Sequence, residues 1–421
     1  MQIKAIVSHP GKQHSFRVAT ALKKHDMLFS YITTIYDKKG SFIMKLIKHF
    51  LSQENLDRAN SRKTEKIKDS DVVLFNQIRG LIEIALARYD SGRKLYNLWQ
   101  HLNSKSFGKK VAKYAIKNQA DIVIAYDTNA LDCFQYLIKH NSNIVRVMDV
   151  SAANRIYMKN IYENDFAKAP LFSKKLKEER RILWNTKNIQ RLQQELESTQ
   201  FFLVPSNFVK ESLEYSGISP NQILMCPYGA NFTVDSSNKK FNFSNRLEVV
   251  YVGNITEMKG IYYLLEAAKS LDSERFHFTV VGKYDNTDHI FDKYMDTVTF
   301  TGRVSHERVK EILSNSDVFV FTSLGEGLSL SVLEALSCGL PCIVTKNSGA
   351  NDAIVDYKNG FVIDIQRTDE IQDRLIWIDA HRELLPEMSI NAKKAAQQYS
   401  WSNHEDKLIE AISSIILTKN V

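Results

Sequence analysis

Short runs of β-branched and aromatic residues alternate along the chain with longer amphipathic segments. In the second half, this pattern predicts strands at 317–323 (DVFVFTS) and 342–345 (CIVT), with a helix at 332–337 between them. A strand, loop, helix and strand in this order are typical of a parallel sheet with helical crossovers. The second half is therefore predicted to be an α/β domain.

The first half shows the same alternation, interrupted by a helical insertion. A helix is predicted at 16–24, after a first strand and a polar loop (HPGKQHS). The strands predicted for a parallel set are 2–9, 30–36, 121–126, 143–149 and 201–206. We expect two doubly wound parallel-sheet domains, because 421 residues exceed what one hydrophobic core usually serves.

The predicted domain limits follow from turn residues and from a final amphipathic helix. Pro227, Gly229 and the polar run 235–240 indicate a linker. The expected units are 1–234, 241–399 and a C-terminal segment, 400–421.

Charge divides the chain into two unequal halves. Residues 1–240 carry 38 Lys and Arg against 22 Asp and Glu, whereas residues 241–421 carry 18 against 26. This split is unlike the diffuse basic surface of a nucleic-acid binder, so no nucleic-acid partner is expected. It suggests that the first domain meets an anionic group, such as a lipid headgroup or a phosphorylated acceptor.

Two apolar segments of the first half are candidates for a surface that contacts a membrane. Residues 41–52 (SFIMKLIKHFLS) place apolar side chains on one helical face and Lys45 and Lys48 on the other. A core helix with a solvated basic face explains this pattern equally well. Residues 80–102 either widen the same surface or pack inside.

Cysteine usage and the amino terminus bear on the compartment. Four cysteines without metal-ligand spacing suit a reducing environment, and no secretory signal or membrane-spanning segment is recognised. We expect a cytoplasmic protein and leave open peripheral binding to the inner face of the cell membrane.

Glu326 and Glu334 bracket the start of the helix predicted after 317–323. Backbone N–H groups around 328–331 would form an anion site there, while carboxylates accept hydrogen bonds from sugar or ribose hydroxyls. The simpler alternative is a helix cap and an ordinary surface carboxylate. The anion site and the two carboxylates together predict a nucleotide-sugar site.

This segment resembles the glutamate-x7-glutamate signature of the GT-B glycosyltransferases of family 4. The resemblance continues in order over roughly 170 residues, a more specific signal than any single motif. The matching segments are VVYVGNITEMKGIYYLLEAA, FTVVGK, VTFTGRVSHERVKEILSNSDVFV, GLPCIV and DYKNGFVI.

The resemblance implies roles for residues of the second domain. Lys259 would bind the donor phosphates, Glu326 the donor sugar and Glu334 the ribose hydroxyls, with Lys259 and Glu326 the implied catalytic residues. The implied donor-binding set is Gly253, Asn254, Lys259, Arg303, Val304, Glu326, Gly327, Leu328, Ser329, Leu330 and Glu334.

On the acceptor side, the resemblance points to the first loop and to the segment after 143–149. Gly11, Lys12 and His14 lie in the first loop, and Asn154 lies where many relatives carry a histidine. The family also usually has an arginine where this chain has Asn254.

The implied reaction is a retaining transfer of a sugar from a nucleoside diphosphate sugar to a hydroxyl acceptor, with a lipid-linked or cell-envelope saccharide preferred. No metal and no cofactor beyond the donor substrate are expected, since the one Asp-x-Asp match, Asp69 and Asp71, does not follow a strand. The alternatives are a catalytically silent nucleotide-sugar-binding or assembly protein and a sugar-nucleotide epimerase.

Overall fold

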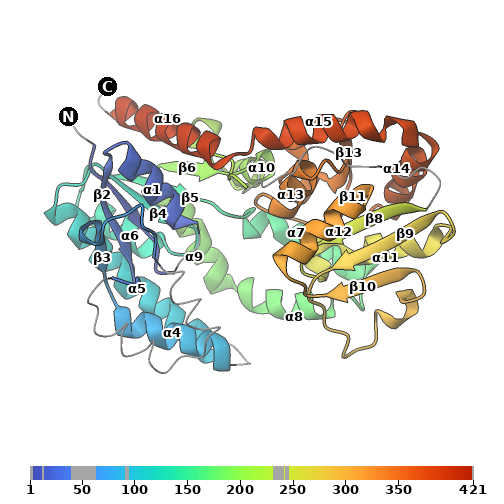
Figure 1. The fold of residues 1–421 in the computed structure, drawn as a ribbon. Coiled ribbons are helices and arrows are strands. Elements are labelled where there is room, and N and C mark those ends of the chain that lie inside the picture. The colour runs from blue at the N-terminus through green and yellow to red at the C-terminus, as the bar shows by residue number, and fades with distance from the viewer. Residues whose placement is uncertain are drawn as a thin grey trace.

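The protein consists of two α/β domains, each built on a parallel sheet (Figure 1). The computed structural model describes residues 3–11, 14–38, 63–90, 94–230, 241 and 246–419. One sheet has seven strands and the other six, and helices flank both. The predicted class of two doubly wound parallel-sheet domains is therefore confirmed.

The first sheet has the strand order β3-β2-β1-β4-β5-β6-β7. Its central strands are continuous apolar runs because both of their faces are covered by helices. The strands are β1 (Ala5–Ser8), β2 (Leu28–Thr33), β3 (Val72–Leu74), β4 (Ile122–Tyr126), β5 (Val145–Asp149), β6 (Phe201–Val204) and β7 (Ile223–Met225). The prediction omitted the two edge strands and placed β2 too late in the sequence.

The helices of the first domain include three between β5 and β6 that the prediction did not anticipate. The helices are α1 (Ser15–Lys24), α4 (Gln77–Tyr89), α5 (Lys94–Lys117), α6 (Leu131–Lys139), α7 (Arg155–Lys168), α8 (Lys174–Leu183), α9 (Thr186–Glu197) and α10 (Asn207–Tyr215). Asp69–Asp71 forms a 3-10 turn before β3, where Asp71 pairs with Lys23 at 2.8 Å.

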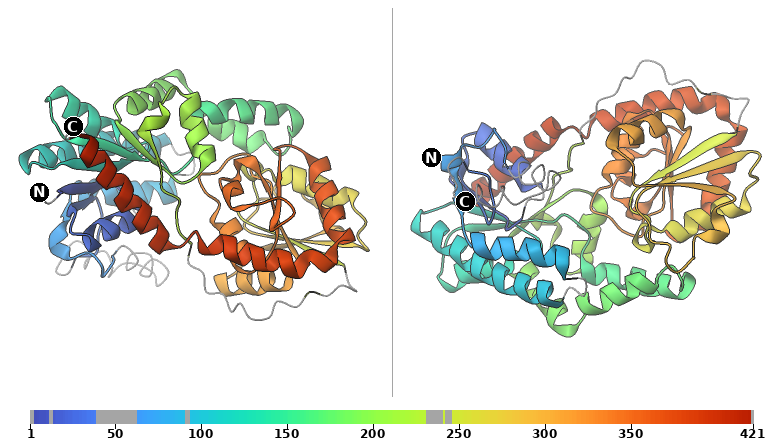
Figure 2. Two further views of the ribbon diagram at one scale, coloured as in Figure 1. Left: turned by 90° about the horizontal axis from the view of Figure 1, so that it is seen from above. Right: turned by 60° about the horizontal axis from the view of Figure 1, so that its bottom comes forward.

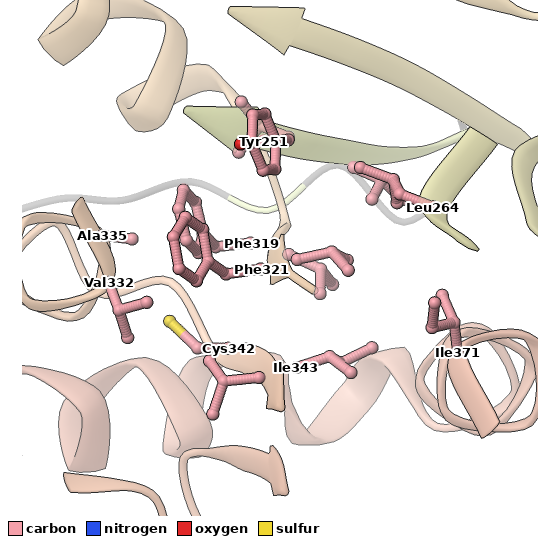
Figure 3. Packing of buried hydrophobic residues seen from close by; sticks show 14 of the residues in the cluster. Tyr251, Leu264, Phe319, Phe321, Val332, Ala335, Cys342, Ile343 and Ile371 are labelled. Atoms are coloured by element: carbon pink, nitrogen blue, oxygen red, sulfur yellow. The ribbon is translucent and has the colours of Figure 1, made fainter. Parts of the chain in front are cut away.

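The second sheet has the strand order β10-β9-β8-β11-β12-β13. Its core stacks Tyr251 on Phe321, with 5.7 Å between ring centroids, and Figure 3 shows these rings with Phe319 and side chains of α13. The strands are β8 (Leu247–Val252), β9 (Phe276–Val281), β10 (Val298–Gly302), β11 (Val318–Phe321), β12 (Cys342–Thr345) and β13 (Gly360–Ile363). The helices are α11 (Ile261–Ser270), α12 (His306–Asn315), α13 (Leu330–Ser337), α14 (Thr368–Ala380) and α15 (Leu385–Gln397).

The chain crosses between the domains a second time through α16 (Trp401–Lys419), which runs back onto the first domain (Figures 1 and 2). Leu408, Ile412 and Ile415 of α16 are buried in the core of that domain. Ala230 and Ser400 form a β-bridge, so the two crossings lie side by side.

Helices α7 and α8 make the reverse exchange. They follow the first sheet in sequence, but Met158, Tyr162, Phe172 and Leu176 share a hydrophobic core with the second domain. Phe172, between the two helices, contacts Tyr262, Phe291 and Tyr294 edge-on or tilted. The first domain therefore holds the second through a helical arm, which extends beneath it in Figure 1.

The proposed surface segments have different outcomes. Residues 41–52, the linker run 235–240 and Lys12 lie outside the described residues. The 80–102 stretch forms parts of α4 and α5, and the idea that it packs inside is wrong for many of its apolar side chains. The exposed ones include Ile82, Ile84, Tyr89, Leu95, Leu98 and Leu102, and Ile78 of α4, just before this stretch, is exposed too. No helix within the described ranges combines the length and apolarity needed to cross a bilayer.

Candidate active site between the two domains

A cavity of about 320 Å³ lies where the two domains face each other. The first domain contributes the segments after β4 and β5 together with α7, α8 and α9. The second contributes Met258 and the loop after β11. The polar and aromatic side chains lining it are Asp127, Thr128, Ser151, Asn154, Arg155, Tyr162, Arg180, Trp184, Glu195 and Glu326.

Glu326 lines the cavity from the second-domain side and forms an ion pair with Lys259, which is not itself among the lining residues. Lys259 ends the 3-10 turn η3 (Glu257–Lys259), and its Nζ donates to Oε1 of Glu326. The Ser323 hydroxyl donates to the same carboxylate oxygen at 3.1 Å. Burial lowers the pKa of Lys259 to about 8. The lysine is therefore cationic at neutral pH.

The loop that carries Glu326 touches the first domain through glycine. A Cβ on Gly327 would lie 1.8 Å from the carbonyl oxygen of Ser151, and one on Gly325 would lie 2.3 Å from Cε of Met158. The Ser206 hydroxyl donates to the Gly327 carbonyl at 2.6 Å. Only residues without a side chain permit this approach of the two domains.

Helix α13 begins close to this loop, but not all of its expected anion donors are free. Ser329 is the N-cap residue, and its N–H donates to the carbonyl of Ser348 at 3.1 Å. Leu328 is buried, whereas the side chain of Leu330 is 43% exposed. The anion site expected at 328–331 thus loses the N–H of Ser329 to an internal bond.

Glu334 does not join Glu326 at the cavity. It lies within α13, where burial raises its pKa while His306 and Lys310 of α12 act to lower it. It is not among the residues that line the cavity. Of the two carboxylates that the sequence pattern placed in one crevice, only Glu326 lines this cavity.

The remaining predicted donor residues follow strands of the second sheet. Gly253 follows β8, and its N–H donates to the Val281 carbonyl at 3.0 Å. Asn254 and Arg303 are exposed, and Val304 packs against the core. These residues share the carboxyl edge of the sheet, outside the cavity lining.

On the first-domain side, His14 and Gly11 are not among the residues that line the cavity. Nε2 of His14 is 3.3 Å from Oδ1 of Asp149, which also accepts the Tyr228 hydroxyl at 2.9 Å. Burial alone would lower the pKa of His14, but the charge and hydrogen bond of Asp149 raise it overall. The Gly11 N–H donates to Nδ1 of His9 at 2.8 Å.

Asn154 lines the cavity, yet its side chain has a structural role. Its Oδ1 accepts the N–H of Ile156 at 2.8 Å and caps α7. Its own N–H donates to the Ser212 hydroxyl at 2.9 Å. Capping, rather than an open ligand position, accounts for the asparagine.

The sequence interpretation missed the charged residues of the first-domain wall: Asp127, Arg155, Arg180 and Glu195. Asp127 directly follows a predicted strand, a signal that could have identified it. Burial raises the pKa of Glu195 to about 7, although the N–H groups of Thr128, Ala130 and Leu131 oppose this by donating to its carboxylate.

Within the described residues, no group of three or more His, Cys, Asp or Glu is placed to hold a metal.

Two doubly wound parallel-sheet domains that face each other across a cavity form the GT-B architecture, and solved structures share this fold. Sucrose-phosphate synthase from Thermosynechococcus elongatus superposes with a TM-score of 0.66, at 15% identity, covering 99% of this chain and 100% of that one. WaaG, a glycosyltransferase involved in lipopolysaccharide biosynthesis, gives a TM-score of 0.55 at 13% identity, covering 96% and 98%.

Residues 234–395, which include most of the second domain, match the family model "Glycosyl transferases group 1". An Escherichia coli UDP-Gal:alpha-D-GlcNAc-diphosphoundecaprenol alpha-1,3-galactosyltransferase is 28% identical over 42% of this chain and 47% of its own. Alpha-D-kanosaminyltransferase from Streptomyces kanamyceticus is 30% identical over 40% of this chain and 46% of its own. The matched part of the chain thus spans about half the length of these curated relatives.

Proposed function

We propose that the protein is a retaining glycosyltransferase of GT-B family 4 that moves a sugar from a nucleoside diphosphate sugar to a hydroxyl acceptor. The proposed reaction needs neither a metal nor a cofactor beyond this donor. The observation that carries the proposal is the Lys259–Glu326 pair at a cavity between the two domains. Transfer requires charge stabilisation on the leaving diphosphate and hydrogen bonds to sugar hydroxyls, which a lysine and a carboxylate supply.

The geometry supports a division of roles between these two side chains. In the absence of a donor each balances the charge of the other, which a buried lysine and carboxylate require. When a diphosphate binds, Lys259 would move to it and Glu326 would turn to the sugar hydroxyls. Glu334 would act from α13 on the ribose, if the nucleoside lies along that helix.

The test is the release of nucleoside diphosphate from a panel of nucleotide sugars with a saccharide acceptor. Lys259→Ala is expected to lose on the order of a hundredfold in rate, as when one preorganised charge-stabilising contact is removed. Glu326→Ala should lose turnover similarly while nucleoside diphosphate binding is retained. Near-normal turnover in both variants would refute the assigned roles.

A catalytically silent nucleotide-sugar-binding or assembly protein is the alternative. It is favoured by the exposed Asn254 at a position where the family has a cation, and by Asn154, whose side chain caps α7. Formation of any product that is lost in Glu326→Ala excludes this alternative. Binding of a nucleotide sugar without turnover of any donor would establish it.

The relative named as acting on a diphosphoundecaprenol sugar supports a lipid-linked acceptor, and the α4–α5 surface supports binding to the inner face of the cell membrane. Ile78, Leu95 and Leu98 are 67%, 62% and 60% exposed, and basic residues such as Arg79 and Arg88 are exposed on the same helices.

Sedimentation with vesicles tests this membrane contact. A protein with Ile78, Leu95 and Leu98 replaced by serine should sediment less with phosphatidylglycerol vesicles, because apolar insertion is lost. The matched control replaces Ile138 and Leu171 elsewhere on the first domain, which are also exposed. Equal sedimentation of both variants and the wild type would remove α4–α5 from the proposal.

A further inference from the structure

The cavity wall that faces Lys259 and Glu326 carries two arginines and a tryptophan, none of which the predicted site included. Arg155 is the first residue of α7, Arg180 lies in α8 and Trp184 immediately follows that helix. All three line the cavity. They belong to the helical arm through which the first domain holds the second.

These side chains have donors without acceptors among the described residues. Nε of Arg180 and Nε1 of Trp184 are buried and make no hydrogen bond there. Nη2 of Arg180 donates to the sulfur of Met258 at 2.8 Å, and a thioether is a weak acceptor. Arg155 makes no ion pair or side-chain hydrogen bond within the described part of the chain.

The cavity's acidic side chains do not use these donors because they are already engaged. Glu195 accepts three backbone N–H groups, the nearest at 2.8 Å, and Asp127 accepts the Ser151 hydroxyl at 2.9 Å. Glu326 is paired with Lys259. The arginines therefore lie near carboxylates without forming an ion pair with them.

The arm also holds the guanidiniums in place. The Arg180 guanidinium lies over the Tyr162 ring, 5.0 Å from its centroid, which fixes its plane. Burial and the nearby charge of Arg180 lower the pKa of Arg155, while Asp127 and Glu195 oppose this. Two like charges held near each other in a partly buried wall favour a bound anion.

We propose that Arg155, Arg180 and Trp184 form a subsite for an anionic group, a phosphate or a carboxylate, carried by the acceptor saccharide. An arginine guanidinium binds such a group through two parallel N–H donors. The indole N–H of Trp184 provides one further donor. The inference rests on the proposed function. The acceptor is favoured as the source because these residues come from the first domain, whereas the pair proposed to bind the donor, Lys259 and Glu326, comes from the second.

The experiment compares two kinds of probe by calorimetry. Glucose 6-phosphate and glucuronate are expected to bind at least tenfold more tightly than glucose, and this preference should disappear in a protein with Arg155→Gln and Arg180→Gln. The same double variant should bind UDP, GDP or ADP like the wild type, whereas Lys259→Ala should not. Nucleotide binding thus tests the proposed function, and sugar-anion selectivity tests the subsite.

Two results would overturn the inference: no preference for the charged sugars in the wild type, or an unchanged preference in the double variant. Loss of nucleotide binding in the double variant would also overturn it, because the arginines would then serve the donor diphosphate. If the double variant does not fold, Trp184→Phe and Arg180→Lys replace it, since they keep the ring or the charge. Each should weaken glucose 6-phosphate binding about threefold to tenfold and leave glucose binding unchanged.

Discussion

The Lys259–Glu326 pair joins two residues that are far apart in sequence and whose roles depend on their charge. Each side chain was singled out from its own motif, but their direct contact is a product of the fold, in which η3 and the loop after β11 meet. The same holds for Arg155, Arg180 and Glu195. No short motif surrounds them, and they come together only because α7, α8 and α9 line one cavity with the second domain.

Lys259 should make donor binding dependent on pH. A lysine is cationic below its pKa, so the affinity for a nucleoside diphosphate should fall as pH rises through about 8. At about pH 9 the loss should approach tenfold, since roughly a tenth of the lysine remains charged. Calorimetry at pH values from about 7 to 9 measures it. Lys259→Arg should give a flat profile, and an identical decline in that variant would refute the role of Lys259.

The elements were predictable where one buried strand or one amphipathic stripe decides the structure. The strand at Cys342–Thr345 has the predicted bounds, and β11 lies within the predicted range. The strands β3 and β7 were missed because three residues give too little periodicity to recognise. Helices α7 and α8 were missed because they pack against the second domain, although they lie within the first domain in sequence. They therefore interrupt the regular alternation of strands and helices on which the prediction relied.

The contact between α7 and η3 contains two buried carboxyl groups. Asp165 accepts the Tyr263 hydroxyl at 2.7 Å and the Ser173 hydroxyl at 2.8 Å, and Glu257 accepts the N–H of Tyr262 at 3.3 Å. Burial raises the pKa of both carboxyl groups, most strongly that of Glu257, whose pKa the charge of Asp165 raises further. A buried carboxyl group near a second carboxylate keeps its proton to a higher pH than the same group in water.

This pair predicts how stability depends on pH. Because the folded protein holds the proton more tightly than the unfolded chain, stability should fall as pH rises from the ordinary carboxyl pKa near 4.5 toward the raised pKa of Glu257. Melting temperatures at about pH 5 and pH 8 measure the loss. Asp165→Asn should reduce the difference, because it removes the like charge that raises the pKa of Glu257. A difference as large as that of the wild type would contradict this account.

In the whole molecule, the cleft is shaped by contacts that cross between the domains. Gly327 should tolerate no side chain, because its Cβ would meet the Ser151 carbonyl, so Gly327→Ala should separate the domains locally. X-ray scattering should show a larger radius of gyration, with lower turnover. Ser206→Ala, which removes only the hydrogen bond to the Gly327 carbonyl, should have a much smaller effect. An unchanged radius in Gly327→Ala would show that the domains meet elsewhere.

Helix α16 follows the second domain in sequence and packs into the core of the first. Ile412 is fully buried in the core of the first domain, so Ile412→Ala should reduce the free energy of unfolding by about 2–5 kcal/mol. Denaturant titration measures the change, and the exposed Leu417 of the same helix provides a control that should lose little when changed to alanine. Equal effects of the two variants would refute the packing of α16.

The central claim is that the cleft wall bearing Lys259 and Glu326 binds the donor nucleotide, and its most direct test is calorimetric binding of UDP, GDP and ADP to the wild type and to Lys259→Ala. We predict that at least one nucleotide binds to the wild type, and that Lys259→Ala weakens this binding by roughly tenfold to a hundredfold, as expected for one lost charge-assisted contact. Binding of none of the three nucleotides, or equal binding to both proteins, would contradict the account.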